Sequence, residues 1–247
     1  MRVVFDTFDE NKGFIENDDG KKYYFKLNSH DCIEIVVERI AKQLGICCAH
    51  YGISSYDGKE LYVSDSLNND GEFILAQDLN IDGTNLFAIW RGIEKFYPQH
   101  VKLLMNDMIK IYIMDLLLMN FDRTDLNWGF YIKDNNVRIA IIDSELAFSI
   151  SSSYISCEER KNPFGLISIN DDNIEILKFL SVSSKEFVDL FARMYRLLTP
   201  EYIENVFLGV EKDIGRSIVA KDICLRIYNE HYQEIGEVIK GTKGLGL

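Results

Sequence analysis

The sequence predicts an α+β protein with two lobes, a β-rich N-terminal lobe with one helix and an α-helical C-terminal lobe. The first third combines short apolar runs, Asp-Gly turn signals and one segment of helical spacing, whereas most of the second half has helical patterns. The 247 residues, 47% apolar and 27% charged, suit one large domain or two closely packed lobes. We predict an N-lobe of residues 1–95 and a C-lobe of residues 96–247, with the crossover near 65–95.

The N-lobe begins with a predicted β-hairpin. The apolar runs Phe14–Ile15 and Tyr23–Phe25 flank a polar turn that ends in Asp19-Gly20. A helix over Ile33–Leu44 follows, because its apolar residues recur at helical spacing. Two more strands, Ala49–Tyr56 and Lys59–Ser64, join at a second Asp-Gly turn. Two later segments are too short to assign: Phe73–Leu79 and Phe87–Trp90.

The C-lobe begins with a long predicted helix over Gln99–Met119 that is apolar nearly all round its last two turns, which is typical of a central helix. A polar segment follows, and then a hairpin of two strands, Trp128–Ile132 and Val137–Ile142. Three further helices are predicted to open near Ser183, Thr199 and Arg216, the first with a capping box and the second with Pro at its first position.

Charge and cysteine content narrow the class of protein. A net charge of -12 disfavours nucleic-acid binding and anionic membranes, since both require clustered Lys and Arg. The five cysteines, odd in number and without a CxxC pair, indicate reduced thiols in a cytoplasmic protein. The start of the chain has no apolar signal-peptide core, and the apolar run Ile111–Met119 is too short to cross a bilayer.

A set of polar residues occupies a suggestive order along the chain. Asp122 and Asn127 are five apart in the segment after the long helix, and Asp143 follows the hairpin. Lys26 ends an early strand, and Glu34 begins the next helix, close enough to form an ion pair. Phosphoryl transfer from ATP needs a cation for the phosphates, oxygen ligands for Mg²⁺ and a carboxylate that orients the attacking hydroxyl. This order of residues predicts such a site.

Five segments carry a resemblance to a known family. LLLMNFDRTDLNWGFYI, followed by IAIIDSELAF, resembles the catalytic and metal-binding motifs of HipA-like serine/threonine kinases. KKYYFKL is similar to the strand that carries the family's ATP lysine, and EIVVERIAKQLGI is similar to the helix that follows it. LYVSDSLNNDGEFILAQDL resembles the family's hinge. The resemblance is scattered over residues 12–150.

The resemblance implies a protein-kinase-like two-lobed fold and an ATP- and Mg²⁺-dependent serine/threonine kinase with a protein substrate. It implies these roles: Asp122 as catalytic base, Asn127 and Asp143 as Mg²⁺ ligands, Lys26 on the ATP phosphates with Glu34 as its partner, and the backbone from Asp65 to Leu67 on adenine. Because HipA-like kinases often work in toxin–antitoxin operons, a small antitoxin, or a protein that supplies an N-terminal subdomain, is an expected partner.

Three departures keep other functions open. Thr124 stands where the family usually has His, and no DFG-type glycine follows Asp143. The predicted phosphate loop before Lys26 has only Gly13 and Gly20 as glycines. The polar residues Thr7 and Asn11 are candidates to replace that cradle. A degenerate kinase fold (a pseudokinase) that acts as a binding or regulatory module, and a kinase for a small molecule, therefore remain alternatives.

Some individual assignments also stay open. Glu38, one turn after Glu34, competes with it as the partner of Lys26. Arg123 fits either a structural role or contact with a phosphorylated loop. Trp128 and the aromatic run Tyr23–Phe25 are expected to belong to the core.

Overall fold

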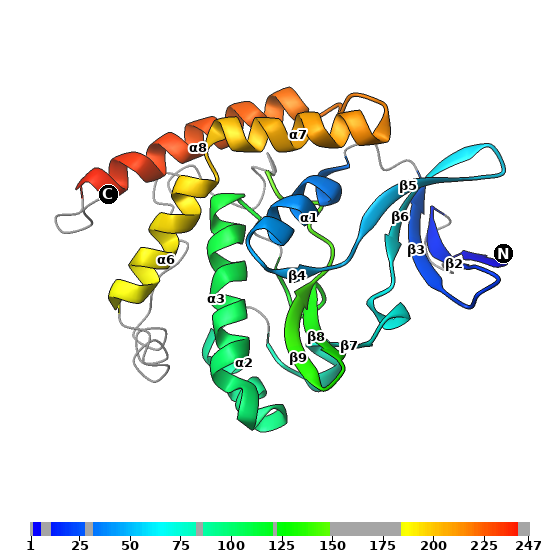
Figure 1. Ribbon diagram of the computed structural model, residues 1–247, viewed down its shortest axis with the longest axis horizontal. Coiled ribbons are helices and arrows are strands. Elements are labelled where there is room, and N and C mark those ends of the chain that lie inside the picture. The colour runs from blue at the N-terminus through cyan, green and yellow to red at the C-terminus, as the bar shows by residue number, and fades with distance from the viewer. Residues whose placement is uncertain are drawn as a thin grey trace.

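The computed structural model describes residues 2–5, 11–27, 32–82, 86–120, 123–148 and 184–241. These residues form an α+β fold in which β-strands predominate in the first third and helices in the C-terminal part, as the sequence predicts (Figure 1). The strands are β1 (Arg2–Phe5), β2 (Lys12–Glu16), β3 (Lys22–Leu27), β4 (Cys47–Cys48), β5 (Tyr51–Tyr56), β6 (Lys59–Asp65), β7 (Glu72–Leu75), β8 (Trp128–Lys133) and β9 (Asn136–Ile141).

Most of the helices that the structure describes lie in the C-terminal part of the chain. The α-helices are α1 (Ile33–Gln43), α2 (Leu86–Phe96), α3 (Val101–Leu117), α6 (Ser184–Leu197), α7 (Pro200–Ile214) and α8 (Lys221–Gly241). Short 3₁₀ helices are η1 (Leu67–Asn69), η2 (Gln77–Leu79) and η3 (Pro98–His100). None of these helices is long and apolar enough to span a membrane.

The first sheet is antiparallel, with strand order β1-β2-β3-β6-β5. Because successive side chains on a strand point to opposite faces, the sheet separates two sets of residues. One face carries a small apolar cluster of Ile15, Phe25 and Leu61. The other face carries Tyr24 and Lys26, which line a cavity. The same alternation that builds the small core therefore aims Lys26 toward the rest of the molecule.

The second sheet has the order β4-β9-β8-β7, with β4 parallel to β9 and the other pairs antiparallel. The pairing of Trp128 with Ile141 brings the residues just outside this hairpin to the same end, and the N–H of Ile142 donates to the carbonyl of Asn127 at 3.0 Å. Two of its strands come from the first 95 residues of the chain. The predicted boundary between residues 95 and 96, which falls within α2, stays a prediction.

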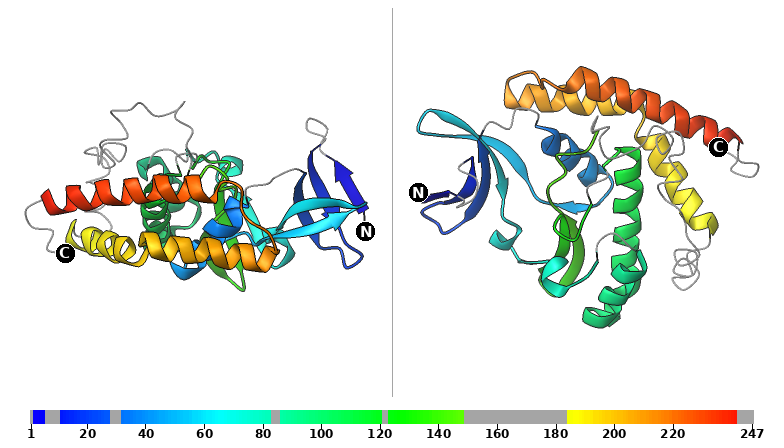
Figure 2. Two further views of the ribbon diagram at one scale, coloured as in Figure 1. Left: turned by 90° about the horizontal axis from the view of Figure 1, so that it is seen from above. Right: turned by 180° about the vertical axis from the view of Figure 1, so that it is seen from behind.

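The main core surrounds α3, which is buried nearly all round, as its apolar pattern predicts. Its side chains pack against β9 and α6, and Asp107 forms an ion pair with Arg138 of β9 at 2.6 Å. Helices α7 and α8 lie side by side, and α7 contacts α1 (Figure 2). The C-terminal helices thus hold α1, including its first turn, against the core.

The segments that the sequence left unassigned take definite structures. Phe73 lies on the edge strand β7, and Phe87–Trp90 belongs to α2. The last helix begins at Lys221 rather than at Arg216, because α7 runs to Ile214 and ends at Gly215 in the left-handed region, with φ 71°. The following residues connect the two helices before α8 can start.

Gly129 on β8 generates a prediction about the second sheet. A Cβ there would lie 2.2 Å from the carbonyl oxygen of Ile74 on β7, so the backbone of one strand must move. Gly129→Ala is expected to destabilise the protein by about 1–3 kcal/mol or more in urea denaturation. Gly52→Ala on β5 is the control, because no heavy atom lies within 4 Å of its added Cβ. Equal stability of the two variants would contradict this packing.

Candidate nucleotide site

A cavity of about 280 Å³ lies between the inner face of the first sheet, α1 and the end of β9. Five residues that the sequence assigns to a nucleotide site line it: Lys26, Glu34, Asp65, Leu67 and Asp143. They come from β3, α1, the end of β6, η1 and the residue pair after β9. Positions separated by more than a hundred residues in the sequence therefore meet at one cavity.

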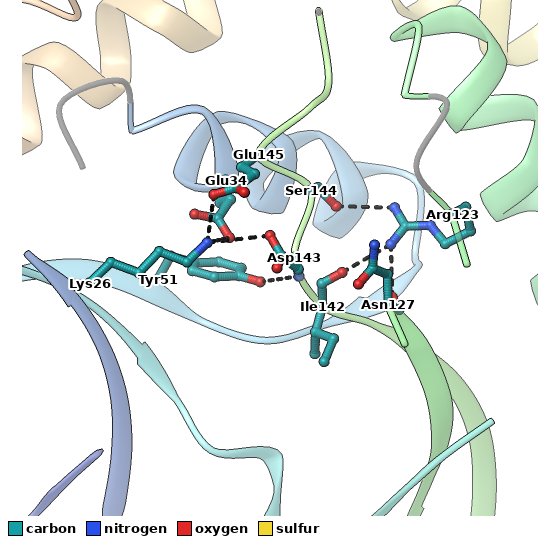
Figure 3. Close-up of polar contacts among 9 residues, drawn as sticks. All are labelled: Lys26, Glu34, Tyr51, Arg123, Asn127, Ile142, Asp143, Ser144 and Glu145. Carbon is teal, nitrogen blue, oxygen red and sulfur yellow. Dashed lines mark hydrogen bonds and ion pairs between the residues drawn. The ribbon is translucent and has the colours of Figure 1, made fainter. Parts of the chain in front are cut away.

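The ammonium group of Lys26 is the centre of this arrangement (Figure 3). Its Nζ lies 3.5 Å from Glu34 Oε1, 3.3 Å from Asp143 Oδ1 and 2.7 Å from Glu145 Oε2. The ion pair between Lys26 and Glu34 that the sequence spacing predicts is therefore present. The contact with Glu145, which was not predicted from the sequence, is the shortest of the three.

The charges in this cluster are unbalanced, and the pKa values reflect that imbalance. Burial opposes protonation of Lys26, but Glu34, Asp143 and Glu145 outweigh it and raise the pKa of the amine. Burial raises the pKa of Glu34 to about 7, against the attraction of Lys26 and with added repulsion from Asp143 and Glu145. One ammonium group is shared by three carboxyl groups, so it does not compensate all of them.

Glu38 is engaged elsewhere, which settles the competition between the two glutamates of α1. Its Oε2 accepts the backbone N–H of Tyr51 at 2.9 Å, and its Oε1 lies 2.6 Å from His50 Nδ1. Lys42, one turn later on α1, also pairs with it. Glu34 alone of the two contacts Lys26.

Arg123 joins the elements on the other side of the cluster. Its Nε and Nη2 donate to the two carboxylate oxygens of Asp115 on α3, at 2.8 and 3.0 Å. Its Nη1 donates to the carbonyls of Asn127 and Ile142, at 2.8 and 3.0 Å, and its Nη2 also donates to Ser144 Oγ at 3.1 Å. The structural role that the sequence left open for Arg123 is therefore present.

The backbone at Asp143 is held in an uncommon conformation. Its φ is 48°, in the left-handed region that non-glycine residues rarely adopt. Its N–H donates to the hydroxyl of Tyr51 at 2.9 Å, and Tyr51 stacks on Tyr62 with ring centroids 5.9 Å apart. This bond and the contacts of Arg123 with the adjacent residues fix the turn that directs the Asp143 side chain to Lys26.

Of the two remaining predicted site residues, the structure describes only Asn127. Asn127 is buried at the start of the hairpin and does not line the cavity, although its carbonyl and that of Ile142 meet at Arg123. Asp122 lies outside the described residues, one position before Arg123. Within the described residues, no group of three or more His, Cys, Asp or Glu side chains is arranged to hold a metal ion. The metal-binding and catalytic roles of these residues stay predictions.

The two glycines of the predicted phosphate loop have structural reasons of their own. A Cβ at Gly13 would lie 2.3 Å from the carbonyl oxygen of Val4 on β1. Gly20 closes the β2–β3 turn with φ 78°. Asn11 accepts the N–H of Leu27 with its carbonyl at 2.6 Å, and Thr7 lies outside the described residues. Neither glycine is thus explained by close approach to a phosphate.

Aromatic residues of the cavity were also missed. Tyr24, Phe14 and Phe73 line it, and the rings of Phe14 and Tyr24 meet edge to face at 5.4 Å. The prediction that Tyr23–Phe25 belongs to the core is wrong for Tyr24, which lines the cavity. The alternation of a strand could have shown this, because Tyr24 must share a face with Lys26, two residues later. Trp128 is fully buried, as predicted.

Solved structures of kinases share this fold. The Helicobacter pylori proinflammatory kinase CtkA matches with a TM-score of 0.57 and 18% identity, over 93% of this chain and 91% of that chain. HipA of the Shewanella oneidensis MR-1 toxin–antitoxin system, solved with HipB and its operator DNA, matches with a TM-score of 0.61 and 14% identity. That match covers 97% of this chain and 68% of the HipA chain. No protein-family model and no curated protein sequence matches the chain. The kinase-like fold implied by the HipA-like motifs is therefore present.

The junction at Arg123 generates a stability prediction. Arg123→Met leaves the carboxylate of Asp115 buried without its cation, so it is expected to cost about 3–5 kcal/mol in chemical denaturation. Asp115→Asn combined with Arg123→Met removes both charges and is expected to cost less than the sum of the single changes. Additive costs would show that the two side chains do not act as a pair.

Proposed function

We propose that this chain is an ATP- and Mg²⁺-dependent phosphotransferase, and more specifically a protein serine/threonine kinase, with its nucleotide in the cavity beside Lys26. The observation that carries the proposal is the meeting of Lys26, Glu34 and Asp143 at one cavity, on a fold shared with solved kinases. An ion-paired lysine next to a carboxylate at the end of a hairpin is what a kinase needs to hold phosphates and metal.

The cavity suits a nucleoside. It presents aromatic side chains from β2, β3 and β7, and its volume is close to the lower end of the usual range for ligand pockets. Asp65 and Leu67 border it where β6 passes into η1. Leu67 is the first residue of η1, a position whose N–H has no partner within the helix. We assign the adenine base to the backbone of Asp65 and Leu67.

The phosphates belong near Lys26 in this proposal. The amine is buried and positively charged, and it points from the sheet toward Asp143 (Figure 3). Glu34 lies behind the amine, on α1, and its ion pair with Lys26 keeps the lysine side chain extended toward the cavity. A buried ammonium group in this place can neutralise phosphate oxygens and hold them in line for transfer.

The chemical types of two predicted side chains suit Mg²⁺. The side chain of Asp143 is 43% exposed, and Asn127 accepts a hydrogen bond from Arg123 with its backbone carbonyl at 2.8 Å. Carboxylate and amide oxygens are the ligands Mg²⁺ takes, and it usually binds through one or two carboxylates and the phosphates of its substrate. Asp143 and Asn127 would hold the ion, which when bound neutralises charge on the transferred phosphoryl group.

We assign Asp122 the role of orienting the substrate hydroxyl and accepting its proton. Its position in the chain supports this, because it directly precedes Arg123, whose side chain is anchored to both Asp115 and the hairpin. The remaining contribution of the chain is positioning, which accounts for much of the catalysis of phosphoryl transfer.

A pseudokinase is the second candidate. The observations that favour it are the structural roles of Gly13 and Gly20 and the contact of Glu145 with the amine that phosphates need. A kinase for a small molecule would use the same base and metal ligands. An assay of the phosphate acceptor therefore distinguishes a small-molecule kinase from a protein kinase.

A protein partner is part of the proposal as well. The similar Shewanella HipA was solved together with HipB and operator DNA. We propose a small partner protein for this chain, in a reducing cytoplasmic setting that suits its free cysteines. Its net charge of -12 gives no support for direct DNA contact.

ATP binding is testable by thermal unfolding. A ligand at one hundred times its Kd stabilises the folded state by about 2.7 kcal/mol, so ATP with Mg²⁺ is expected to raise Tm by about 5–10 °C. Lys26→Met and Asp143→Asn should lose most of this shift. Lys133→Met, at the exposed last residue of β8, should keep it. A wild-type protein without any shift would contradict the nucleotide site.

Phosphoryl transfer requires a separate assay, with labelled ATP and the protein itself or a candidate protein as acceptor. Asp122→Ala is expected to lower the rate by about 10²–10⁴-fold while the Tm shift with ATP and Mg²⁺ remains. Asp125→Ala, in the same segment, is the matched control and should transfer normally. Unchanged transfer by Asp122→Ala would refute its role, and nucleotide binding without transfer by the wild type would identify a pseudokinase.

A further inference from the structure

Glu145 has no role in the proposed binding or transfer of phosphate, yet it makes the closest contact with Lys26. Its Oε2 lies 2.7 Å from Lys26 Nζ, nearer than Asp143 at 3.3 Å or Glu34 at 3.5 Å. The Glu145 side chain is 50% exposed, whereas that of Glu34 is 4% exposed. Glu34 therefore holds the amine from inside the protein, and Glu145 reaches it from the solvent side.

The position of Glu145 is built into the fold. Immediately before it, Ser144 accepts a hydrogen bond from Arg123 and is itself buried. The turn that contains Glu145 closes when the N–H of Ala147 donates to the carbonyl of Ser144 at 3.1 Å. The N–H of Phe148 then donates to the carbonyl of Leu118 at 2.7 Å, in the core. Hydrogen bonds on both sides of Glu145 thus fix its backbone next to Lys26. The contact between the two side chains therefore differs from an isolated ion pair on the surface, whose backbone positions are not fixed in this way.

The contact has a consequence for any phosphate that approaches Lys26. An ammonium group has three N–H donors, and here three carboxylates surround it. A phosphate oxygen can gain a close contact with Nζ only where one of these carboxylates withdraws. Glu34 is buried on α1 and cannot reach solvent. The Asp143 side chain is 43% exposed, but its carboxylate is assigned to the metal ion in the proposed function. The longer Glu145 side chain is 50% exposed, has no such role there and can turn into solvent.

We propose that Glu145 is a positioning residue that occupies Lys26 in the nucleotide-free chain and competes with the phosphates of the nucleotide for it. The nucleotide binds only as Glu145 releases the amine. The inference rests on the proposed nucleotide site and adds an internal competitor to it. Because a divalent cation offsets the negative charge of the phosphates and carboxylates, the competition is strongest for ATP without metal.

The test compares Glu145→Gln with the wild type by titration calorimetry of ATP, in EDTA and in Mg²⁺. Without metal, Glu145→Gln is expected to bind ATP about tenfold more tightly, or about 1.4 kcal/mol. With Mg²⁺ the gain should be smaller. Glu60→Gln is the matched control, because Glu60 pairs with Arg216 at the same 2.7 Å and its side chain is 48% exposed. It should bind ATP as the wild type does.

A double-mutant cycle separates competition for Lys26 from simple repulsion of ATP by a nearby charge. In a Lys26→Met background measured with Mg²⁺, Glu145→Gln is expected to bring no gain, because the contact is already absent. The inference would be overturned if Glu145→Gln tightened ATP binding in the Lys26→Met background by the same factor as in the otherwise wild-type protein with Mg²⁺. It would also be overturned if Glu145→Gln alone brought no gain in EDTA. Either result would leave the nucleotide site intact. Failure of the wild type to bind ATP with Mg²⁺ would instead overturn the proposed function itself. Unchanged unfolding midpoints without ATP would show that the variants fold.

Discussion

The contact between Arg123 and Asp115 is the interaction on which the site depends most. One guanidinium group binds a carboxylate of the central helix α3 and two carbonyls, those of Asn127 and Ile142, that flank the hairpin β8–β9. Removing two opposite charges from water is costly, and such a pair persists where its hydrogen bonds are satisfied. Here all three guanidinium nitrogens have partners, and the result is a fixed relation between α3, the segment before the hairpin and the turn after it.

The rest of the site follows from this relation. Once Ile142 and Ser144 are held at Arg123, the turn between them places Asp143 with a positive φ and directs its carboxylate to Lys26. Lys26 reaches the same point from the first sheet because it lies on the face opposite the small apolar cluster. The cavity thus lies between a sheet and a hairpin that come from distant parts of the chain. A ligand in it would contact both, and the proposed nucleotide would link them.

The sequence predicted those parts of the fold whose signals are local. The Asp-Gly turns located two hairpins, and the apolar pattern of α3 identified a central helix. The helix α2 escaped notice because five apolar residues stand in a row at its start, which masks the helical period. Its Gly92 also reads as a helix breaker, yet Ile81 packs where a Cβ would stand, at 2.5 Å. That constraint is tertiary and leaves no trace in the local pattern.

The contacts of the candidate site likewise include some that the sequence predicts and some that it does not. The ion pair between Lys26 and Glu34 could be predicted, because the strand that carries Lys26 and the helix that carries Glu34 are consecutive in the sequence. The contact of Glu145 with Lys26 could not be predicted, because it depends on a turn that is held by Arg123, itself bound to Asp115 of α3. The partner of Arg123 likewise lies on an earlier helix, eight residues away in sequence. Residues that act through a network of hydrogen bonds are recognised only when the network is visible.

The most direct measurement is a crystal structure of the protein with a non-hydrolysable ATP analogue and Mg²⁺. Our account predicts adenine against the backbone of Asp65 and Leu67, a phosphate oxygen within hydrogen-bond distance of Lys26 Nζ, and Mg²⁺ between the phosphates and the side chains of Asp143 and Asn127. A nucleotide bound elsewhere, or bound in the cavity with its phosphates turned away from Lys26 and Asp143, would contradict it.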